Sequence, residues 1–249
     1  ATPMLKDLNI KDCGEIAFKR AMSQIGPVKI ESGKYSMVIE SEVASRLVTP
    51  VLNALGGYSL QQKNSFMLDS LGKKMFPEWL NIWDRPVSVG ETGSRLFDSE
   101  GVATAEMPIV ENGVVKEYFV NTYMSRKMGV EATVEDATSP GVLPCLAQAV
   151  AEPVEATCGK EGLMRIVGEG ILVTGFNGGN SNSATGDFSF GVEGFLFKDG
   201  KIVHPVREML ITGNLLTLWN NLLAAGNDAR FCKSKLIPTL AFGNVDFSA

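Results

Sequence analysis

The glycine-rich segment 174–187 gathers more potential ligand contacts than any other part of the chain. It reads Thr-Gly-Phe-Asn-Gly-Gly-Asn-Ser-Asn-Ser-Ala-Thr-Gly-Asp, which combines a freely turning backbone with short hydrogen-bonding side chains. The order fits neither Gly-x-x-x-x-Gly-Lys-Ser/Thr nor Gly-x-Gly-x-x-Gly, and a strand-like Phe-Ser-Phe follows where a phosphate loop would lead into a helix. We expect a long loop that either contacts a substrate or partner or simply connects two strands at the surface.

Asp98 and Glu100 stand two residues apart in the run Phe-Asp-Ser-Glu-Gly. On a strand, both carboxylates would share one face, where they could act as an acid/base pair or bind a hard cation. The run is also typical of a turn, and two carboxylates are too few for a calcium loop. We favour the structural interpretation of this pair.

Histidine and cysteine are too sparse for a recognisable zinc site. The single histidine, His204, cannot supply the two imidazoles of a His-Glu-x-x-His helix. The four cysteines, Cys13, Cys145, Cys158 and Cys232, lie far apart without a Cys-x-x-Cys pair, which favours reduced thiols. A cysteine hydrolase that pairs Cys158 or Cys232 with His204 is a separate hypothesis, although no protease signature surrounds either thiol.

The composition is that of an ordinary globular protein. Of the 249 residues, 45% are hydrophobic and 20% are charged, which is enough for one sizeable core. The net charge is −5 and no stretch concentrates Lys and Arg, so nucleic acid is not an expected partner. No run approaches the roughly 20 apolar residues that cross a bilayer, and no signal-peptide pattern is present. We therefore predict a cytoplasmic protein without membrane contact.

Helical spacing of apolar residues predicts two helices near the start of the chain. The first spans Asp12–Ile25 and begins with capping-box spacing. A buried strand is predicted at Tyr35–Ile39, after which Ser41 is expected to cap a second helix with an apolar face over Leu47–Leu55. Pro50 lies inside this second helix and predicts a kink or a break.

Two dipeptides predict β-hairpins, because Asn-Gly and Asp-Gly adopt the positive φ angles of tight hairpin turns. Asn112-Gly113 separates the apolar runs 107–110 and 114–120, and Asp199-Gly200 separates the runs 190–197 and 201–206. Pro108 lacks a backbone N–H, so its strand is expected at a sheet edge or at a bulge.

The end of the chain predicts a helix followed by a strand. The helix spans Leu215–Ala225, with Asn214 as its cap and Gly226 in the left-handed position beyond its end. The strand spans Lys235–Phe247. Hairpins separated by a few helices indicate an α+β fold, with a largely antiparallel sheet and packed helices in a single domain over residues 1–249.

An ordered set of short motifs fills the last third of the chain. They are Thr185-Gly-Asp-Phe-Ser189, Gly191-Val-Glu-Gly194, Asp199-Gly200, Pro205-Val206, Ile211-Thr-Gly-Asn-Leu215 and Ala225-Gly-Asn-Asp228. In order and spacing they resemble the C-terminal domain of the TldD/PmbA family, and segments further upstream fit the same family. The resemblance implies the fold of that domain, and we expect the chain to lack the family's N-terminal domain.

Members of this family are cytosolic peptidases that work as pairs of related subunits. Only one subunit holds zinc, through a His-Glu-x-x-x-His helix and a later cysteine. The Thr-Gly-Asp-Phe-Ser and Thr-Gly-Asn-Leu forms, with the single histidine, make this chain similar to the other, PmbA/TldE-type subunit. The resemblance therefore implies no catalytic residue, metal ligand or cofactor in this chain, and zinc in a TldD-like partner subunit.

The leading hypothesis is a non-catalytic subunit of a TldD/TldE-type metallopeptidase that acts in proteolysis or peptide maturation. An extended peptide could add to the sheet as a further strand. Asn177, Asn180 and Asp187, in the glycine-rich segment, are the candidate substrate contacts. The alternative is a non-enzymatic peptide-binding or scaffold protein that associates only with itself.

Overall fold

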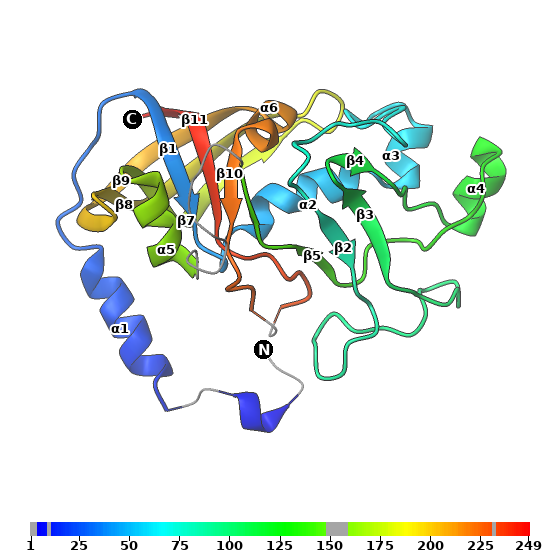
Figure 1. Ribbon diagram of the computed structural model, residues 1–249, viewed down its shortest axis with the longest axis horizontal. Coiled ribbons are helices and arrows are strands. Elements are labelled where there is room, and N and C mark those ends of the chain that lie inside the picture. Colours follow the sequence, from blue (N-terminus) through cyan, green and yellow to red (C-terminus); the bar gives the residue numbers. More distant parts are fainter. Residues whose placement is uncertain (1–3, 9–10, 148–158, 231–232) are drawn as a thin grey trace.

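The protein consists of two β-sheets with helices between and around them (Figure 1). The computed structural model describes residues 4–8, 11–147, 159–230 and 233–249. The helices are η1 (Leu5–Asp7), α1 (Cys13–Ser23), α2 (Ser45–Ala54), α3 (Gly57–Gln61), α4 (Thr122–Met128), α5 (Gly159–Val167) and α6 (Leu215–Asn220). The smaller sheet contains β2 (Ile82–Asp84), β3 (Met107–Glu111), β4 (Val114–Val115) and β5 (Pro140–Val142).

The larger sheet has seven strands and closes on itself. Its strands are β1 (Gly33–Ile39), β6 (Cys145–Leu146), β7 (Gly170–Ser181), β8 (Asp187–Lys198), β9 (Lys201–Asn214), β10 (Leu222–Ala225) and β11 (Leu240–Ser248). They follow the order β1-β7-β8-β9-β11-β10-β6, and β1 also pairs with β11, so five strands form a ring. The predicted antiparallel pairing is found at every pair of named strands except β1 with β7, which is parallel. The predicted largely antiparallel pairing is therefore confirmed, but the prediction did not include closure of the sheet. β1 joins two strands that an open sheet would leave at its edges.

Both predicted hairpin turns are confirmed. Asn112 and Gly113 have φ angles of 51° and 75°, and Asp199 and Gly200 have φ angles of 51° and 70°. Pro108 lies in β3, an internal strand, and the pairing of β3 with β2 shifts register beside it. The prediction of a bulge is thus correct, because the irregular register accommodates a residue that cannot donate a ladder hydrogen bond.

The predicted long loop at 174–187 is wrong in extent. β7 continues to Ser181 and β8 begins at Asp187, so only residues 182–186 form the turn. Register shifts after Val173 and after Phe176 let β7 carry its glycines while it stays paired with β8. Pairing with β8 therefore overrides the low strand propensity of Gly and Asn.

The main core joins the two sheets through α2, which lies between them in Figure 1. Leu47, Val48 and Val51 of α2 are fully buried, as the apolar pattern predicted. Trp219 donates its indole N–H to the carbonyl of Leu47 at 3.3 Å and packs edge-on against Phe242. These contacts fix α2 against the larger sheet.

Two helix boundaries differ from the prediction. Ser41 does not cap α2, because residues 41–44 form a turn in which Ala44 N–H bonds to the carbonyl of Glu40. The predicted helix Leu215–Ala225 ends at Asn220, and its second half is strand β10, paired with β11 and β6.

The chain turns into β10 because the Leu-Leu-Ala-Ala run can complete the sheet, an interaction that helical spacing alone does not reveal. Gly226 has no positive φ angle, so its predicted left-handed role is wrong. Asn214 does cap α6, accepting the N–H of Leu216 at 3.0 Å. The terminal strand β11 begins at Leu240 and not at Lys235.

Helix α1 confirms the first predicted helix but stands away from the core (Figure 1). It contains no buried residue, and the exposed fraction of Phe18 is 64%. Arg20 ties it to the rest of the molecule through an ion pair with Glu42 at 2.6 Å.

Among the described residues, the helices are all too short or too polar to traverse a lipid bilayer.

Candidate functional site

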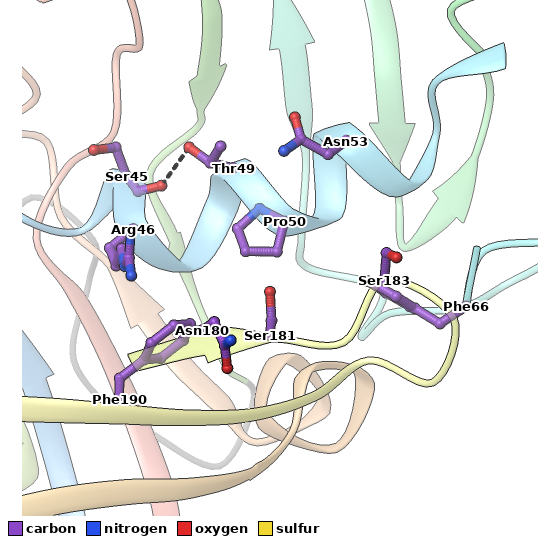
Figure 2. Close-up of a pocket in the computed structure, with 10 residues that line it drawn as sticks. All are labelled: Ser45, Arg46, Thr49, Pro50, Asn53, Phe66, Asn180, Ser181, Ser183 and Phe190. Atoms are coloured by element: carbon purple, nitrogen blue, oxygen red, sulfur yellow. Dashed lines mark hydrogen bonds between the residues drawn. The ribbon is translucent and has the colours of Figure 1, made fainter. Parts of the chain in front are cut away.

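A cavity of about 450 Å³ lies between α2 and the β7–β8 hairpin (Figure 2). Its lining residues are Ser45, Arg46, Thr49, Pro50, Asn53, Phe66, Asn180, Ser181, Ser183 and Phe190. The volume falls in the range of small-molecule and short-peptide pockets. It is the best candidate for a functional site because it combines an apolar base with several side chains that can form hydrogen bonds.

The polar face of α2 forms one wall of the cavity. Ser45, Thr49 and Asn53 recur every four residues, so they align on the face opposite the buried apolar stripe. Figure 2 shows them along one side of the helix, where Thr49 Oγ1 donates to the carbonyl of Ser45 at 2.8 Å. Pro50 continues the helix without a break, but it has no N–H to offer the carbonyl of Arg46. That carbonyl therefore lacks its usual helical donor beside the cavity.

The β7–β8 hairpin forms the opposite wall. Asn180 and Ser181 come from β7, and Phe190 of β8 forms part of the apolar base. Gly179 has a φ angle of +85°, and a Cβ atom there would lie 2.1 Å from the carbonyl oxygen of Ser189. Only glycine fits this bulge, which sets the path of the strand next to the cavity.

Arg46 links the two walls and is the only charged residue among those that line the cavity. Its Nη2 donates to the carbonyl of Gly179 at 2.7 Å. Its guanidinium carbon lies 5.0 Å from the centre of the Phe190 ring, a cation–π distance. The guanidinium is therefore held in one place although the side chain is exposed.

Strand β7 has a free edge beside this cavity. β1 pairs with β7 only over Ile171–Val173, so among the described residues no strand covers β7 on this side from Thr174 onward. Asn180 and Ser181 of this extension line the cavity. An uncovered edge of this kind presents N–H and C=O groups that an extended peptide can pair with.

The three residues predicted as substrate contacts separate in the structure. Asn180 lines the cavity. Asn177 lies on β7 outside the cavity lining, and its Nδ2 donates to Glu193 at 3.4 Å. Asp187 accepts from Asn214 at 3.0 Å and from Thr185 at 2.7 Å, which lowers the pKa of its carboxyl below the usual value. Asp187 therefore holds the hairpin turn to the start of α6.

The carboxylates of Asp98 and Glu100 also have structural partners. Asp98 accepts the N–H groups of Glu100 and Val102 at 2.9 and 2.8 Å, which forms the turn that the sequence favours. Glu100 accepts both the N–H and the hydroxyl of Thr122 at 2.7 Å, at the start of α4. Neither residue lines the cavity, so the acid/base alternative finds no support in this geometry.

His204 and the cysteines do not assemble a nucleophilic site in the described part of the chain. His204 lies within β9, opposite Leu196 of β8. Burial raises the pKa of the Cys145 thiol to about 11, which keeps it protonated and unreactive at neutral pH. Cys158 and Cys232, the other thiols of the cysteine-hydrolase hypothesis, lie outside the described residues.

The donor groups of the cavity do not fit zinc. Protein zinc sites use His, Cys, Asp or Glu, whereas the lining offers hydroxyls, amides and one guanidinium. Over residues 4–8, 11–147, 159–230 and 233–249, no group of three or more His, Cys, Asp or Glu is placed to hold a metal ion. The cavity is therefore suited to hydrogen bonding and anion binding.

Sequence reasoning missed the contribution of α2 to this site. The signal was present as a polar stripe at helical spacing, formed by Arg46, Thr49 and Asn53 around the unusual Pro50. The buried apolar stripe on the opposite face was recognised instead. What the polar stripe faces depends on the closure of the sheet, which brings the β7–β8 hairpin opposite α2.

Known proteins resemble the chain in both sequence and structure. The family model for the PmbA/TldA metallopeptidase C-terminal domain matches residues 32–249. The metalloprotease PmbA homolog of Haemophilus influenzae is 35% identical over 215 residues, which cover 86% of this chain and 46% of the relative. Metalloprotease PmbA of Escherichia coli O157:H7 is 32% identical over 227 residues, covering 89% and 48%. The chain thus spans about half the length of these curated relatives.

Solved structures give the same result. A candidate modulator of DNA gyrase from Bacteroides thetaiotaomicron has a TM-score of 0.91 and 45% identity, covering 98% of this chain and 54% of its own. TldE from Thermococcus kodakarensis has a TM-score of 0.83 over 98% of this chain and 56% of its own, and its 20% identity makes it a likeness of fold alone. With the family model and the curated relatives, these matches show that the chain belongs to the PmbA/TldD metallopeptidase family, whose C-terminal domain it contains.

Proposed function

We propose that the chain is the C-terminal part of a non-catalytic, cytosolic PmbA/TldE-type subunit of a two-subunit metallopeptidase. In this proposal the cavity between α2 and the β7–β8 hairpin holds part of an extended peptide. A TldD-like partner subunit supplies the zinc and the catalytic residues. The PmbA relatives support the family assignment on which this proposal rests.

The chemistry of the cavity is the observation that carries the proposal. Its polar groups are neutral amides and hydroxyls, with Arg46 as the single charge. Such groups can bind a peptide but cannot take a proton from water near neutral pH, as a general base must. The site therefore supports binding, with chemistry left to another subunit.

The free edge of β7 gives the peptide a second means of attachment. A strand added there would pair with backbone groups from Thr174 to Ser181. Side chains of the peptide that point toward α2 would enter the cavity, while the backbone pairing would tolerate many sequences. This mode suits a subunit that presents unfolded or extended peptides to a peptidase.

Zinc content and peptidase activity of the purified protein test the non-catalytic assignment. We expect less than stoichiometric zinc by inductively coupled plasma mass spectrometry and no cleavage of unfolded peptides by the protein alone. Activity should appear after addition of a family member with a His-Glu-x-x-x-His helix. Stoichiometric zinc with cleavage by the purified protein alone would show that the assignment is wrong.

A pull-down from lysate of the source cells separates the two expected modes of association. Recovery of a relative with a His-Glu-x-x-x-His motif, identified by mass spectrometry, supports the two-subunit peptidase. Recovery of the bait alone, together with a discrete self-associated mass by light scattering, supports the alternative of a homo-oligomeric peptide-binding or scaffold protein.

A further inference from the structure

We propose that Arg46 is a carboxylate-binding residue, so that the cavity selects peptides that present a carboxylate to it. This inference rests on the proposed peptide-binding function and adds the chemical class of the group that the cavity recognises. The carboxylate comes either from the C-terminus of a peptide or from an Asp or Glu side chain. Both sources offer the same planar pair of oxygen atoms.

The guanidinium of Arg46 is oriented before any ligand arrives. One N–H of Nη2 is used by the carbonyl of Gly179 at 2.7 Å, and the guanidinium carbon lies 5.0 Å from the centre of the Phe190 ring. A guanidinium has five N–H donors, so four are left for a ligand. Because the side chain is already ordered, binding a carboxylate costs less conformational entropy than it would at a mobile surface arginine.

Arg46 also lacks an acidic partner among the described residues. Several other arginines have one: Arg20 and Arg230 pair with Glu42, and Arg85 pairs with Glu106. Arg46 instead contacts a carbonyl and an aromatic ring, which leave its positive charge uncompensated. A fixed and uncompensated charge at the wall of a cavity favours an anionic ligand.

The remaining polar groups suit a carboxylate attached to a peptide. The amides of Asn53 and Asn180 and the hydroxyl of Ser45 line the same cavity and make no hydrogen bond to another described residue. Amide N–H and hydroxyl groups can donate to a second carboxylate oxygen or to a peptide carbonyl. The cavity lining therefore combines several hydrogen-bond donors with one cation.

Fluorescence anisotropy with a set of matched peptides tests this inference. The probe is a short peptide of Ala, Ser and Val, labelled with a neutral BODIPY dye that has no free carboxylate. It is made in three forms: with a free C-terminal carboxylate, with an amidated C-terminus, and with an amidated C-terminus plus one internal Glu. We expect at least one of the two peptides with a carboxylate to bind about tenfold more tightly than the amidated peptide without Glu. Which form is preferred identifies the source of the carboxylate.

Variants then assign the preference to Arg46. Arg46→Gln should remove the difference between acid and amide forms, and Arg46→Lys should keep only part of it, because an ammonium lacks the planar fork. Arg126→Gln on α4 is the matched control, since Arg126 is exposed and lies outside the cavity. The comparison of peptides on the unmodified protein does not depend on the folding of any variant.

The possible outcomes distinguish failure of the carboxylate inference from failure of the proposed peptide binding. Equal binding of all three peptides, unchanged by Arg46→Gln, would overturn the carboxylate inference while peptide binding itself stands. A preference for the acid that persists in Arg46→Gln would place the recognition elsewhere and would also overturn it. Binding of none of the peptides, by the protein alone or with its partner subunit, would count against both the inference and the proposed function.

Discussion

Among single residues, Gly179 has two effects on the site. Its carbonyl accepts a hydrogen bond from Arg46, and its bulge sets the path of β7 past the cavity. Its φ angle of +85° is rarely adopted by other residues. A side chain at this position would also meet the backbone of Ser189. Both effects act on the same short stretch of strand.

Gly179→Ala is expected to destabilise the protein by about 2 to 4 kcal/mol and to weaken peptide binding, because the strand must shift away from Ser189. Gly178→Ala is the matched control. Gly178 also has a positive φ angle, +97°, but a Cβ there meets nothing within 4 Å. Denaturant unfolding of both variants measures the difference. Equal destabilisation would show that the contact with Ser189 is unimportant.

Asp187 is expected to act on stability and not on peptide binding. Hydrogen bonds from Asn214 and then Thr185 lower the pKa of its carboxyl below the usual value for an aspartate. A lowered folded-state pKa stabilises the protein above the unfolded pKa, and this stabilisation is lost as the pH falls through the folded value. Asp187→Asn should therefore flatten the loss of stability below about pH 4, and Thr185→Val should flatten it less.

Thermal unfolding from pH 2 to pH 6, followed by circular dichroism, measures this effect. Peptide affinity at neutral pH should be unchanged in Asp187→Asn, since this residue lies outside the cavity lining. If Asp187→Asn lost stability below pH 4 as steeply as the unmodified protein, the structural role of Asp187 would be contradicted. A loss of peptide affinity, with the same loss of stability at low pH, would instead support Asp187 as a ligand contact.

Among the secondary-structure elements, helix α2 has two roles, one on each face. Its apolar face contributes to the core through Leu47, Val48 and Val51, which are fully buried. Its polar face presents Arg46 and Asn53 to the cavity. Pro50 lies between these faces and interrupts the hydrogen-bond ladder without ending the helix.

Pro50→Ala is expected to raise the free energy of unfolding by about 1 to 3 kcal/mol, because the new N–H can bond to the carbonyl of Arg46. The substitution should also weaken peptide binding, because it removes the Pro50 ring from the cavity lining. Thr49→Ala serves as a control that changes the same helix face but keeps the proline. Unfolding and anisotropy titrations measure the two effects. Lower stability in Pro50→Ala would contradict this account of α2.

The elements that depend on local geometry could be predicted from the sequence. Both hairpin turns were located correctly because Asn112-Gly113 and Asp199-Gly200 adopt positive φ angles wherever they occur between strands. The segment Leu215–Ala225 was only half correct, because β10 exists through its pairing with β11 and β6. Those partners are distant in sequence, and helical spacing holds no information about them.

The candidate site could likewise be predicted only in part from the sequence. Asn180 was found from the composition of its segment, whereas Arg46 was not found at all. The role of Arg46 arises from Gly179 and Phe190, more than 130 residues away, whose positions depend on the fold of the hairpin. Composition can thus identify a segment with ligand-binding side chains, but it cannot identify the residues that this segment faces.

At the scale of the whole molecule, closure of the larger sheet creates the site. β1 pairs with β11 on one side and with only three residues of β7 on the other, and the chain then turns into α2. β7 consequently extends past the ring with one edge uncovered, and α2 lies across from it (Figure 2). The cavity and the free strand edge are two results of the same topology.

Hydrogen exchange followed by mass spectrometry tests most directly that a peptide binds in this cavity and along β7. The protein is compared with and without a saturating, cleavage-resistant extended peptide. We expect slower amide exchange at 174–181, where the peptide would pair, and at 45–53 on α2. Protection confined to other elements, such as the hairpin of β3 and β4, or no protection at saturation, would contradict it.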